Sequence, residues 1–272
     1  MKKSLNFKSY FTFTKNVFQR NLAYKANTIM FILGDMMILA VTYYLWKAIY
    51  SSASESILNG FTYNDMIIYV LLSFLTQGLI STEVSNTIFR EVRNGSIASN
   101  LIKPISYEKR MLFEGFGSVL YQFVLAFIIG FSVVVIISIK TGSGIKFTNM
   151  IIYFVSVVLS YFINFYYSYS MGLLTFKITN MWGVEQIMQA VTALFSGALI
   201  PIAFFPEIVQ KIFDFFPFKS IIYTPCMIFE NKFSSYEICI ALGRQVFWVI
   251  VMMFIGKMMY KALIKNLTIL GG

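Results

Sequence analysis

Six long apolar segments alternate along the chain with shorter stretches that are rich in polar and charged residues. The segments are approximately 27–48, 64–87, 112–139, 150–176, 183–204 and 238–260. An α-helix needs about 20 apolar residues to cross a hydrocarbon core of roughly 30 Å, and each segment provides about that number. The pattern therefore predicts an all-α, polytopic integral membrane protein with six transmembrane helices. We expect one transmembrane domain, residues 1–272.

The segment before the first span, residues 4–22, has a different pattern. Aromatic and apolar residues such as Tyr10 and Val17 recur near helical spacing, and Lys15 and Arg20 lie on the opposite side. Such a helix has an apolar face and a basic face, which suits the headgroup region of a bilayer. We expect an amphipathic interfacial helix. A short helix that packs on a partner protein is the alternative.

Prolines concentrate after the fifth apolar segment. Pro201, Pro206, Pro217 and Pro225 fall close together within a stretch that is otherwise apolar. Proline at this density prevents one continuous helix. Residues 205–236 are therefore predicted to form a re-entrant pair of short helices at the outer face. Arg244, near the outer end of the last span, is expected to reach outward or to pair with an outer acidic residue.

Charge sets the predicted orientation. The chain is 58% hydrophobic and 12% charged, with a net charge of +10. If the N-terminus is cytoplasmic, the basic residues before residue 26 and those of 90–110 all lie inside, as the positive-inside rule requires. An even number of spans then places the C-terminus inside as well. Membrane orientation and attraction to anionic lipid account for the positive charge, so no nucleic-acid partner is predicted.

The sequence gives little support for an enzyme active site or a metal site. The chain has no His and only two Cys, Cys226 and Cys239, which argues against a zinc site or a disulfide scaffold. We expect both thiols to be free. No phosphate-binding loop, serine nucleophile elbow or metalloprotease motif occurs. The sequence predicts a protein that is not an enzyme and that has no metal site and no bound cofactor.

The loop after the second span, residues 89–106, is the most informative segment. It is basic at its start, and Gly95 interrupts it. A short helical stretch with Ile97, Leu101 and Ile102 on one face follows, and Pro104 ends it. A short helix of this kind suits docking to a cytoplasmic protein, although an ordinary turn between spans would look similar. The predicted docking residues are Arg90, Glu91, Arg93, Gly95, Ile97, Leu101, Lys103 and Pro104.

Polar residues also recur inside the apolar segments. The first span contains Asp35 and Thr42, the second contains Ser73, Gln77, Ser81 and Ser85 with Glu83 near its inner end, and the fifth contains Glu185, Gln189, Thr192 and Ser196. Polar groups in hydrocarbon usually face the protein interior or a water-filled path. The stripes therefore indicate a shared polar seam, either a substrate path or hydrogen bonds between helices. The candidate path residues are Asp35, Thr42, Gln77, Glu83, Gln189, Thr192 and Ser196.

The fourth span carries Ser156, Ser160, Asn164, Ser168 and Gly172 at intervals of four. Small residues at this spacing allow helices to approach closely. We therefore interpret this stripe as a packing surface.

Residues 89–106 and 196–225 together resemble the membrane subunit of an ABC-2 type exporter. The resemblance rests on Gly95, Leu101 and Pro104 in the loop, and on the segments SGALIPIAFFP and FFPFKSIIYTP after the fifth span. It extends by architecture over nearly the whole chain. Asp35 and Glu83 match no motif of the family.

The resemblance implies a permease of the cytoplasmic membrane that has no ATPase activity of its own. A second permease subunit, the same chain or a related one, would pair with it in the bilayer. Two separate ATPase subunits would bind ATP and Mg²⁺ and would each receive the loop near residues 90–104. An ATP-independent secondary transporter or channel is the alternative.

Overall fold

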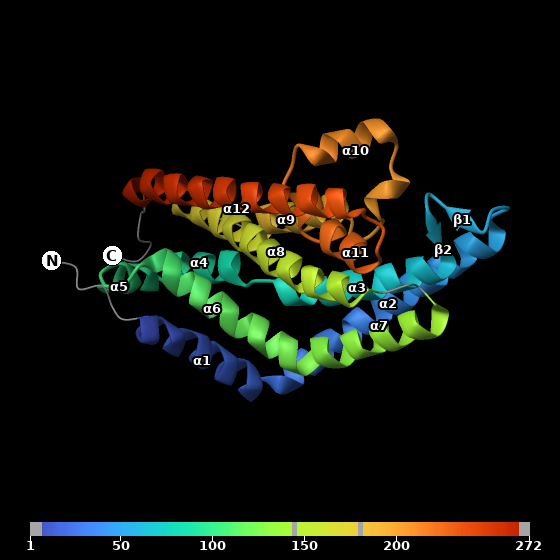
Figure 1. Cartoon of the computed structure of the whole chain (residues 1–272). Helices are drawn as coiled ribbons and strands as arrows, with labels where there is room; N and C mark the ends of the chain where they lie inside the picture. Colours follow the sequence, from blue (N-terminus) through green and yellow to red (C-terminus); the bar gives the residue numbers. More distant parts are fainter. Residues whose placement is uncertain (1–6, 143–145, 179–181, 267–272) are drawn as a thin grey trace.

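Long helices run side by side through most of the chain in the computed structural model, which describes residues 7–142, 146–178 and 182–266 (Figure 1). The α-helices are α1 (Phe7–Ala23), α2 (Lys25–Ser52), α3 (Tyr63–Ile80), α4 (Val84–Arg93), α5 (Ser96–Leu101), α6 (Tyr107–Gln122), α7 (Ile128–Thr141), α8 (Phe147–Leu173), α9 (Trp182–Phe195), α10 (Glu207–Asp214), α11 (Tyr223–Phe229) and α12 (Ser235–Leu263). A two-stranded antiparallel hairpin, β1 (Ile57–Leu58) with β2 (Phe61–Thr62), is a small addition that the sequence did not predict.

Five of the six predicted spans are confirmed as long apolar helical segments. The candidate spans among the described residues are Ile32–Ser52, Tyr63–Arg93, Tyr107–Thr141, Phe147–Phe176 and Ser235–Leu263. Each is long enough to cross a bilayer at 1.5 Å per residue. The protein is therefore an all-α, multi-pass membrane protein apart from the hairpin.

The prediction that residues 183–204 form a single transmembrane helix is wrong. α9 has 14 residues, or about 21 Å, which is shorter than a hydrocarbon core. The chain then turns at Gly197, which has a φ of +80°. A Cβ there would lie 2.9 Å from the Tyr69 hydroxyl, so the turn requires glycine. The Tyr69 hydroxyl donates to the Gly197 carbonyl at 2.7 Å and ties this turn to α3.

The second predicted span, 64–87, is also interrupted. α3 ends at Ile80, residues 81–83 are not helical, and α4 begins at Val84. The Nδ2 of Asn164 in α8 donates to the Ile80 carbonyl at 2.7 Å. This bond satisfies one of the carbonyls that a helix end leaves without a partner, which would otherwise be costly in a buried setting.

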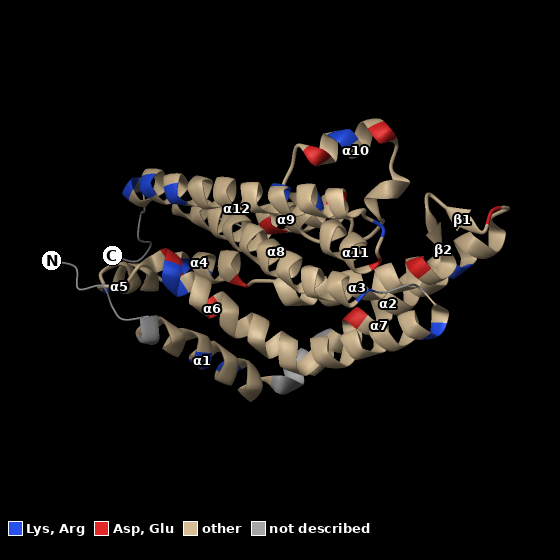
Figure 2. Ribbon diagram, viewed as in Figure 1, with Lys and Arg blue, Asp and Glu red and all other residues tan. Residues whose placement is uncertain are grey.

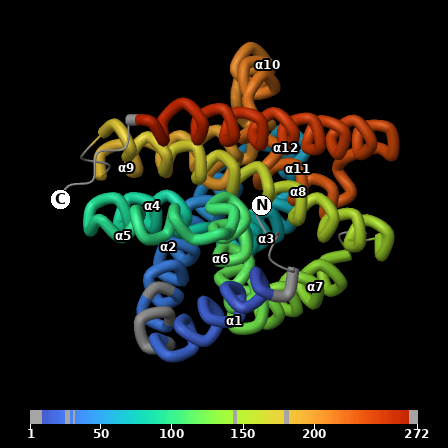
Figure 3. The backbone as a smooth tube through the Cα atoms, turned by 90° about the vertical axis from the view of Figure 1, so that its left-hand side faces the viewer, coloured from blue at the N-terminus to red at the C-terminus, as the bar shows by residue number. Residues whose placement is uncertain are grey.

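The proline-rich region forms two short helices, as the sequence predicts. α10 and the segment Phe218–Phe229, which contains α11, are bent by 85° relative to each other. All residues of α11 are buried, whereas Ile208 of α10 is 74% exposed. α10 stands away from the helices of the bundle in two views (Figures 1 and 3). Their re-entrant placement in a bilayer stays a prediction.

The predicted interfacial helix is present as α1, and it crosses α6 (Figure 3). Thr14 Oγ1 donates to the Phe113 carbonyl of α6 at 2.7 Å. A Cβ on Gly117 would lie 2.8 Å from Val17, so the two helices approach closely. Phe11 is 57% exposed on the other part of the apolar face. One part of the apolar face of α1 therefore packs on α6, and another part is exposed. The exposed part is compatible with a bilayer surface, and that placement stays a prediction.

The two ends of the bundle differ. The start of α1, the short helix α5 and the end of α12 lie at one end, and the β-hairpin lies at the other (Figure 1). Basic residues gather at the α5 end, while the middle of the bundle carries few charges (Figure 2). α8 ends near α5, and α12 starts at the opposite end, so α9 and residues 196–234 return the chain across the bundle.

The third span contains a π-helical turn. Residues Phe123–Phe127 form this turn, η1, between α6 and α7. The rings of Phe123 and Phe127 stack with centroids 5.5 Å apart, and those of Phe127 and Phe131 stack at 5.0 Å. The aromatic stack therefore continues through the irregular turn and joins the two helices into one span.

Candidate substrate cavity and docking segment

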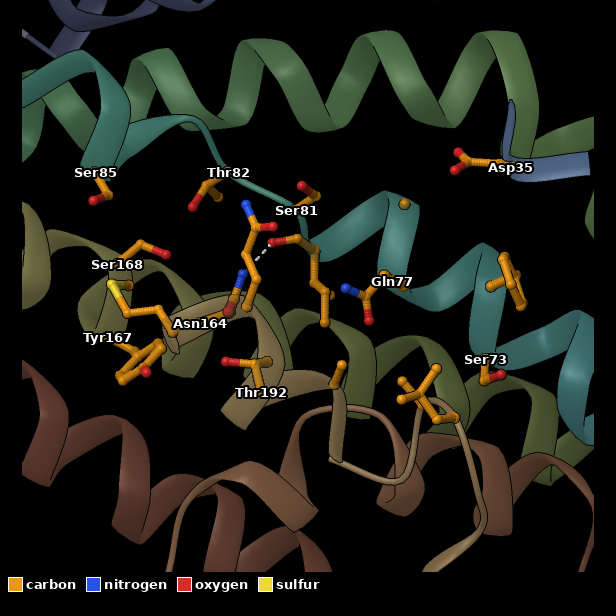
Figure 4. Close-up of a pocket in the computed structure, with 18 of the residues that line it drawn as sticks. Asp35, Ser73, Gln77, Ser81, Thr82, Ser85, Asn164, Tyr167, Ser168 and Thr192 are labelled. Atoms are coloured by element: carbon orange, nitrogen blue, oxygen red, sulfur yellow. Dashed lines mark hydrogen bonds between the residues drawn. The ribbon is translucent and has the colours of Figure 1, made fainter. Parts of the chain in front are cut away.

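A cavity of about 590 Å³ lies between α2, α3, α8 and α9, beside the break that separates α3 from α4 (Figure 4). Most of its lining consists of amide, hydroxyl and carboxyl side chains. The polar lining residues are Asp35, Ser73, Gln77, Ser81, Thr82, Ser85, Gln122, Asn164, Tyr167, Ser168, Glu185, Gln189 and Thr192. This volume is within the range of sites for drug-sized molecules.

The predicted polar seam is confirmed, because stripes from three spans line one cavity. Four of the seven candidate path residues contribute to it: Asp35, Gln77, Gln189 and Thr192. They come from α2, α3 and α9, which are far apart in sequence. The interpretation of these stripes as a shared surface therefore describes the geometry correctly.

Three candidate path residues do not line the cavity. Thr42 Oγ1 donates to the carbonyl of Ile38, one turn earlier in its own helix, at 2.9 Å. Ser196 is fully buried beside the turn after α9. Glu83 lies just before α4 and lines a much smaller neighbouring pocket with Arg20. These three residues lie outside this cavity, and their assignment to a substrate path stays a prediction.

The sequence reasoning missed one wall of the cavity, which α8 provides. Asn164, Tyr167 and Ser168 line it. The four-residue spacing of Asn164 and Ser168 was visible in the sequence, but it was interpreted as packing alone. That interpretation holds for Gly172, where a Cβ would lie 2.9 Å from Ile88 of α4.

The remaining members of the α8 stripe join a buried hydrogen-bond network with α12. Ser156 Oγ donates to Gln245 Oε1 at 3.0 Å. Gln245 Nε2 donates to Ser160 Oγ at 3.0 Å and to the Ser220 carbonyl at 2.8 Å. Gln245 is fully buried. The network holds α8, α12 and the segment before α11 together.

The loop 89–106 contains the predicted short helix. Gly95 adopts the left-handed region with φ of 73°, which favours glycine, and α5 follows directly. Asn94 Oδ1 accepts from the Ser96 backbone NH at 3.0 Å and from its hydroxyl at 2.6 Å. α5 ends at Leu101, three residues before Pro104. The shape predicted for this segment is confirmed.

Two of the predicted docking residues face the protein's own interior. Ile97 is fully buried in the core, and Glu91 forms an ion pair with Arg110 of α6. Leu101 is half-buried against the same core. The prediction that Ile97 and Leu101 form the outward apolar contact is therefore corrected, because their shared face turns inward.

The outward surface of the loop is formed by other residues. Arg90, Arg93, Lys103 and Pro104 are exposed. Ile102, the third member of the predicted apolar face, follows α5 directly and is 84% exposed. It is an exposed apolar residue within this basic loop.

Ion pairs hold both ends of the bundle. Near the α5 end, Tyr107 Oη donates to Glu91 Oε2 at 2.9 Å, and Arg110 Nε lies 3.5 Å from Glu114 Oε1. Arg244 of α12 pairs with Asp214 of α10. The predicted acidic partner is thus present, and its placement at the outer face stays a prediction.

The two cysteines are free, as expected from the sequence. Cys226 is buried in α11, and Cys239 is exposed near the start of α12.

These features define the class of protein. It is a multi-pass membrane protein in which apolar helices surround a polar cavity, with a basic loop at one end. A family model described as ABC-2 family transporter protein matches residues 36–271. The chain therefore belongs to the ABC-2 transporter family, as the loop and the proline-rich region indicated. No curated protein matches the chain.

Proposed function

We propose that the chain is the transmembrane permease subunit of an ATP-binding-cassette exporter. It moves a substrate across the cytoplasmic membrane with energy from a separate ATPase subunit. The family match over residues 36–271 is the observation that supports this most strongly. The sequence contains no phosphate-binding loop, so ATP and Mg²⁺ are bound by the partner.

The ATPase docks on the loop that contains α5. Arg90, Arg93, Ile102 and Lys103 are all exposed in this segment. An exposed apolar residue in a basic segment suits a cleft that has an apolar floor and acidic edges. In this arrangement the α5 end and both termini are cytoplasmic.

Movement of the docked loop reaches the cavity through α4. Ile97 anchors α5 in the core, and the Glu91–Arg110 pair joins α4 to α6. α4 also packs closely on α8 around Gly172. The break at residues 81–83 follows the last cavity residues of α3. A shift of α4 thus changes the angle at this break and alters the cavity wall.

The working exporter contains two permease subunits and two ATPase subunits. Asp35, Gln77 and Gln189 line the cavity yet are exposed in the single chain. Polar side chains at membrane depth face protein or a water-filled path rather than lipid. A second permease, the same chain or a related one, provides that cover, and lipid surrounds the remaining apolar faces.

Ile102→Asp tests this proposal. The tagged chain is expressed with its own ATPase partner, purified, and assayed for the amount of ATPase retained and for ATP-driven transport. The variant places a carboxylate in the apolar contact and should lose the ATPase at least tenfold, equivalent to about 1.4 kcal/mol. Its membrane insertion and thermal stability should be unchanged, because Ile102 contacts little of its own chain.

Ile57→Asp is the matched control, since Ile57 is 53% exposed in the hairpin at the opposite end of the bundle. It should retain the ATPase fully. Full ATPase retention by a correctly inserted Ile102→Asp chain would contradict the docking assignment. A wild-type chain that transports without any ATPase would instead support a secondary transporter or channel.

A further inference from the structure

The charged residues that line the cavity all have the same sign. Asp35 of α2 and Glu185 of α9 both contribute to its wall, and no Lys or Arg does. Within the part of the chain that the structure describes, neither carboxylate takes part in an ion pair. An uncompensated carboxylate in a low-dielectric environment attracts a positive charge strongly.

A third carboxylate lies beside the inner part of the cavity. Asn86 Nδ2 donates to Glu83 Oε2 at 3.4 Å, and the Asn86 side chain also hydrogen-bonds Glu185. The Asn86 amide thus lies between the carboxylate of Glu83, just before α4, and that of Glu185 in α9. Arg20 of α1 shares a small pocket with Glu83 and offsets part of its charge. Glu185 has no such basic neighbour among the described side chains lining the cavity.

The neutral part of the lining is rich in oxygen acceptors. Asn164 uses its Nδ2 to donate to the Ile80 carbonyl, and Ser73 Oγ donates to the Val70 carbonyl at 2.9 Å. Both side chains are therefore left with oxygen lone pairs for other partners. Hydroxyl and amide oxygens can accept hydrogen bonds from a cation or solvate it, so the neutral lining can add to the attraction of the two carboxylates.

We propose that the cavity binds an organic cation of drug-like size. This inference rests on the proposed function and adds the charge class of the substrate. Asp35 and Glu185 supply the attraction from two sides, the oxygen-rich lining solvates the charge, and the volume of about 590 Å³ sets the size. An anionic substrate of the same size binds less well, because the two carboxylates repel it and no Lys or Arg among the described lining residues pairs with it.

Binding of two nearly isosteric ions of opposite charge provides the test. The full chain in lipid nanodiscs is dialysed against tetraphenylphosphonium or tetraphenylborate, and binding to empty nanodiscs is subtracted. The wild-type chain should bind the cation at least tenfold more tightly than the anion, which corresponds to about 1.4 kcal/mol. The Asp35→Asn/Glu185→Gln double variant should bind the cation about tenfold more weakly.

Glu55→Gln is the control, because Glu55 is exposed in the loop before the hairpin. The substitution removes one carboxylate outside the cavity, where the double variant removes two from its wall. It should leave cation affinity unchanged. Glu185→Lys should reverse the preference toward tetraphenylborate, a gain that misfolding cannot produce.

Equal binding of both ions, no binding of the cation, or an unchanged double variant would each overturn the cation proposal. None of these results affects ATPase retention, which tests the proposed function separately.

Discussion

The carboxylate of Glu91 in α4 pairs with the buried guanidinium of Arg110 in α6. Glu91 also accepts a hydrogen bond from the Tyr107 hydroxyl, and the Arg110 guanidinium lies 5.1 Å from the centre of the Tyr107 ring. Two groups thus fix Glu91, so the helix that leads into the docking loop is fastened to the third span.

Arg110→Met is therefore expected to destabilise the chain. It leaves Glu91 without its buried partner, and breaking one side of a buried pair typically costs about 3–5 kcal/mol. Glu91→Leu combined with Arg110→Met should recover part of the loss, because the unpaired Glu91 charge is removed, while Glu114 still lacks its Arg110 partner. Unfolding of the purified variants in detergent measures the double-mutant cycle. Arg93→Met, a change at an exposed position of α4, serves as the control. Equal stability of Arg110→Met and Arg93→Met would show that the pair contributes nothing.

Gln245→Leu should loosen the contact between α8 and α12. The substitution leaves the buried Ser156 hydroxyl without its Gln245 partner, whereas Ser160 Oγ still donates to the Ser220 carbonyl at 3.0 Å. An unsatisfied buried group costs about 1–3 kcal/mol, so a loss of about this size is expected in the free energy of unfolding. Gln186→Leu, at an exposed position of α9, is the comparison. The network has no stabilising role if the two variants unfold alike.

Glu230 predicts a pH dependence of stability. It lies directly after α11, it is buried, and neither carboxyl oxygen has a hydrogen-bond partner among the described residues. Burial first, and then the charge of Asp65, raises the pKa of Glu230 well above its ordinary value, while Lys232 lowers it. The folded state therefore holds this proton at a pH at which the unfolded chain has released it.

The sign follows from this difference in bound protons. The contribution of Glu230 to stability is complete below the unfolded pKa of about 4.3 and is lost as the pH rises toward the folded pKa. Glu230→Gln should remove that loss, so the variant gains stability over the wild type as the pH rises above the unfolded pKa of about 4.3. Melting temperatures over a pH series that starts near this value measure the effect, with Glu55→Gln as the control. A constant difference between wild type and Glu230→Gln across the range would refute the assignment.

Thr192→Trp should block the cavity. Thr192 belongs to its α9 wall, and a tryptophan would fill part of the about 590 Å³ and clash with the facing side chains. ATP-driven transport should fall by at least about tenfold, while the ATPase remains bound, because the docking loop is unaffected. Thr148→Trp introduces the same residue at an exposed position near the start of α8 and should transport normally. Normal transport by both variants would place the substrate path elsewhere.

Much of the fold could be predicted because hydrophobic length alone specifies it. The segments 150–176 and 238–260 are uninterrupted apolar runs, and the structure has α8 and α12 there. The break at residues 81–83 was missed for a tertiary reason: Asn164, distant in sequence, satisfies the Ile80 carbonyl and makes the interruption tolerable. The turn at Gly197 was missed because residues 196–204 are as apolar as the helix before them.

The candidate site, like the fold, could be predicted only in part from the sequence. Periodicity identified Asp35, Gln77 and Thr192 as members of polar stripes, and stripes of this kind must face protein or water. Periodicity cannot say which stripes meet, so the α8 wall with Asn164 was assigned to packing. In the loop, spacing placed Ile97 on an apolar face without showing whether that face turns inward or outward. Its burial and the exposure of Ile102 depend on how α5 lies against the core.

The π-helical turn at Phe123–Phe127 makes the third span sensitive to chain length. A π-turn contains one residue more than the corresponding α-helical turn. Deleting one residue from this stretch would convert the turn to regular α-helix and leave the faces of α6 and α7 in nearly their present relation. Deleting one residue between 128 and 133, in the regular part of α7, would instead rotate the helix that follows by about 100° relative to α6. Val134 and Ser138, which are buried on α7, would then leave their contacts while the composition of the span stayed almost the same. Hydropathy would not detect such a deletion, although it would turn a whole face of the helix away from the bundle.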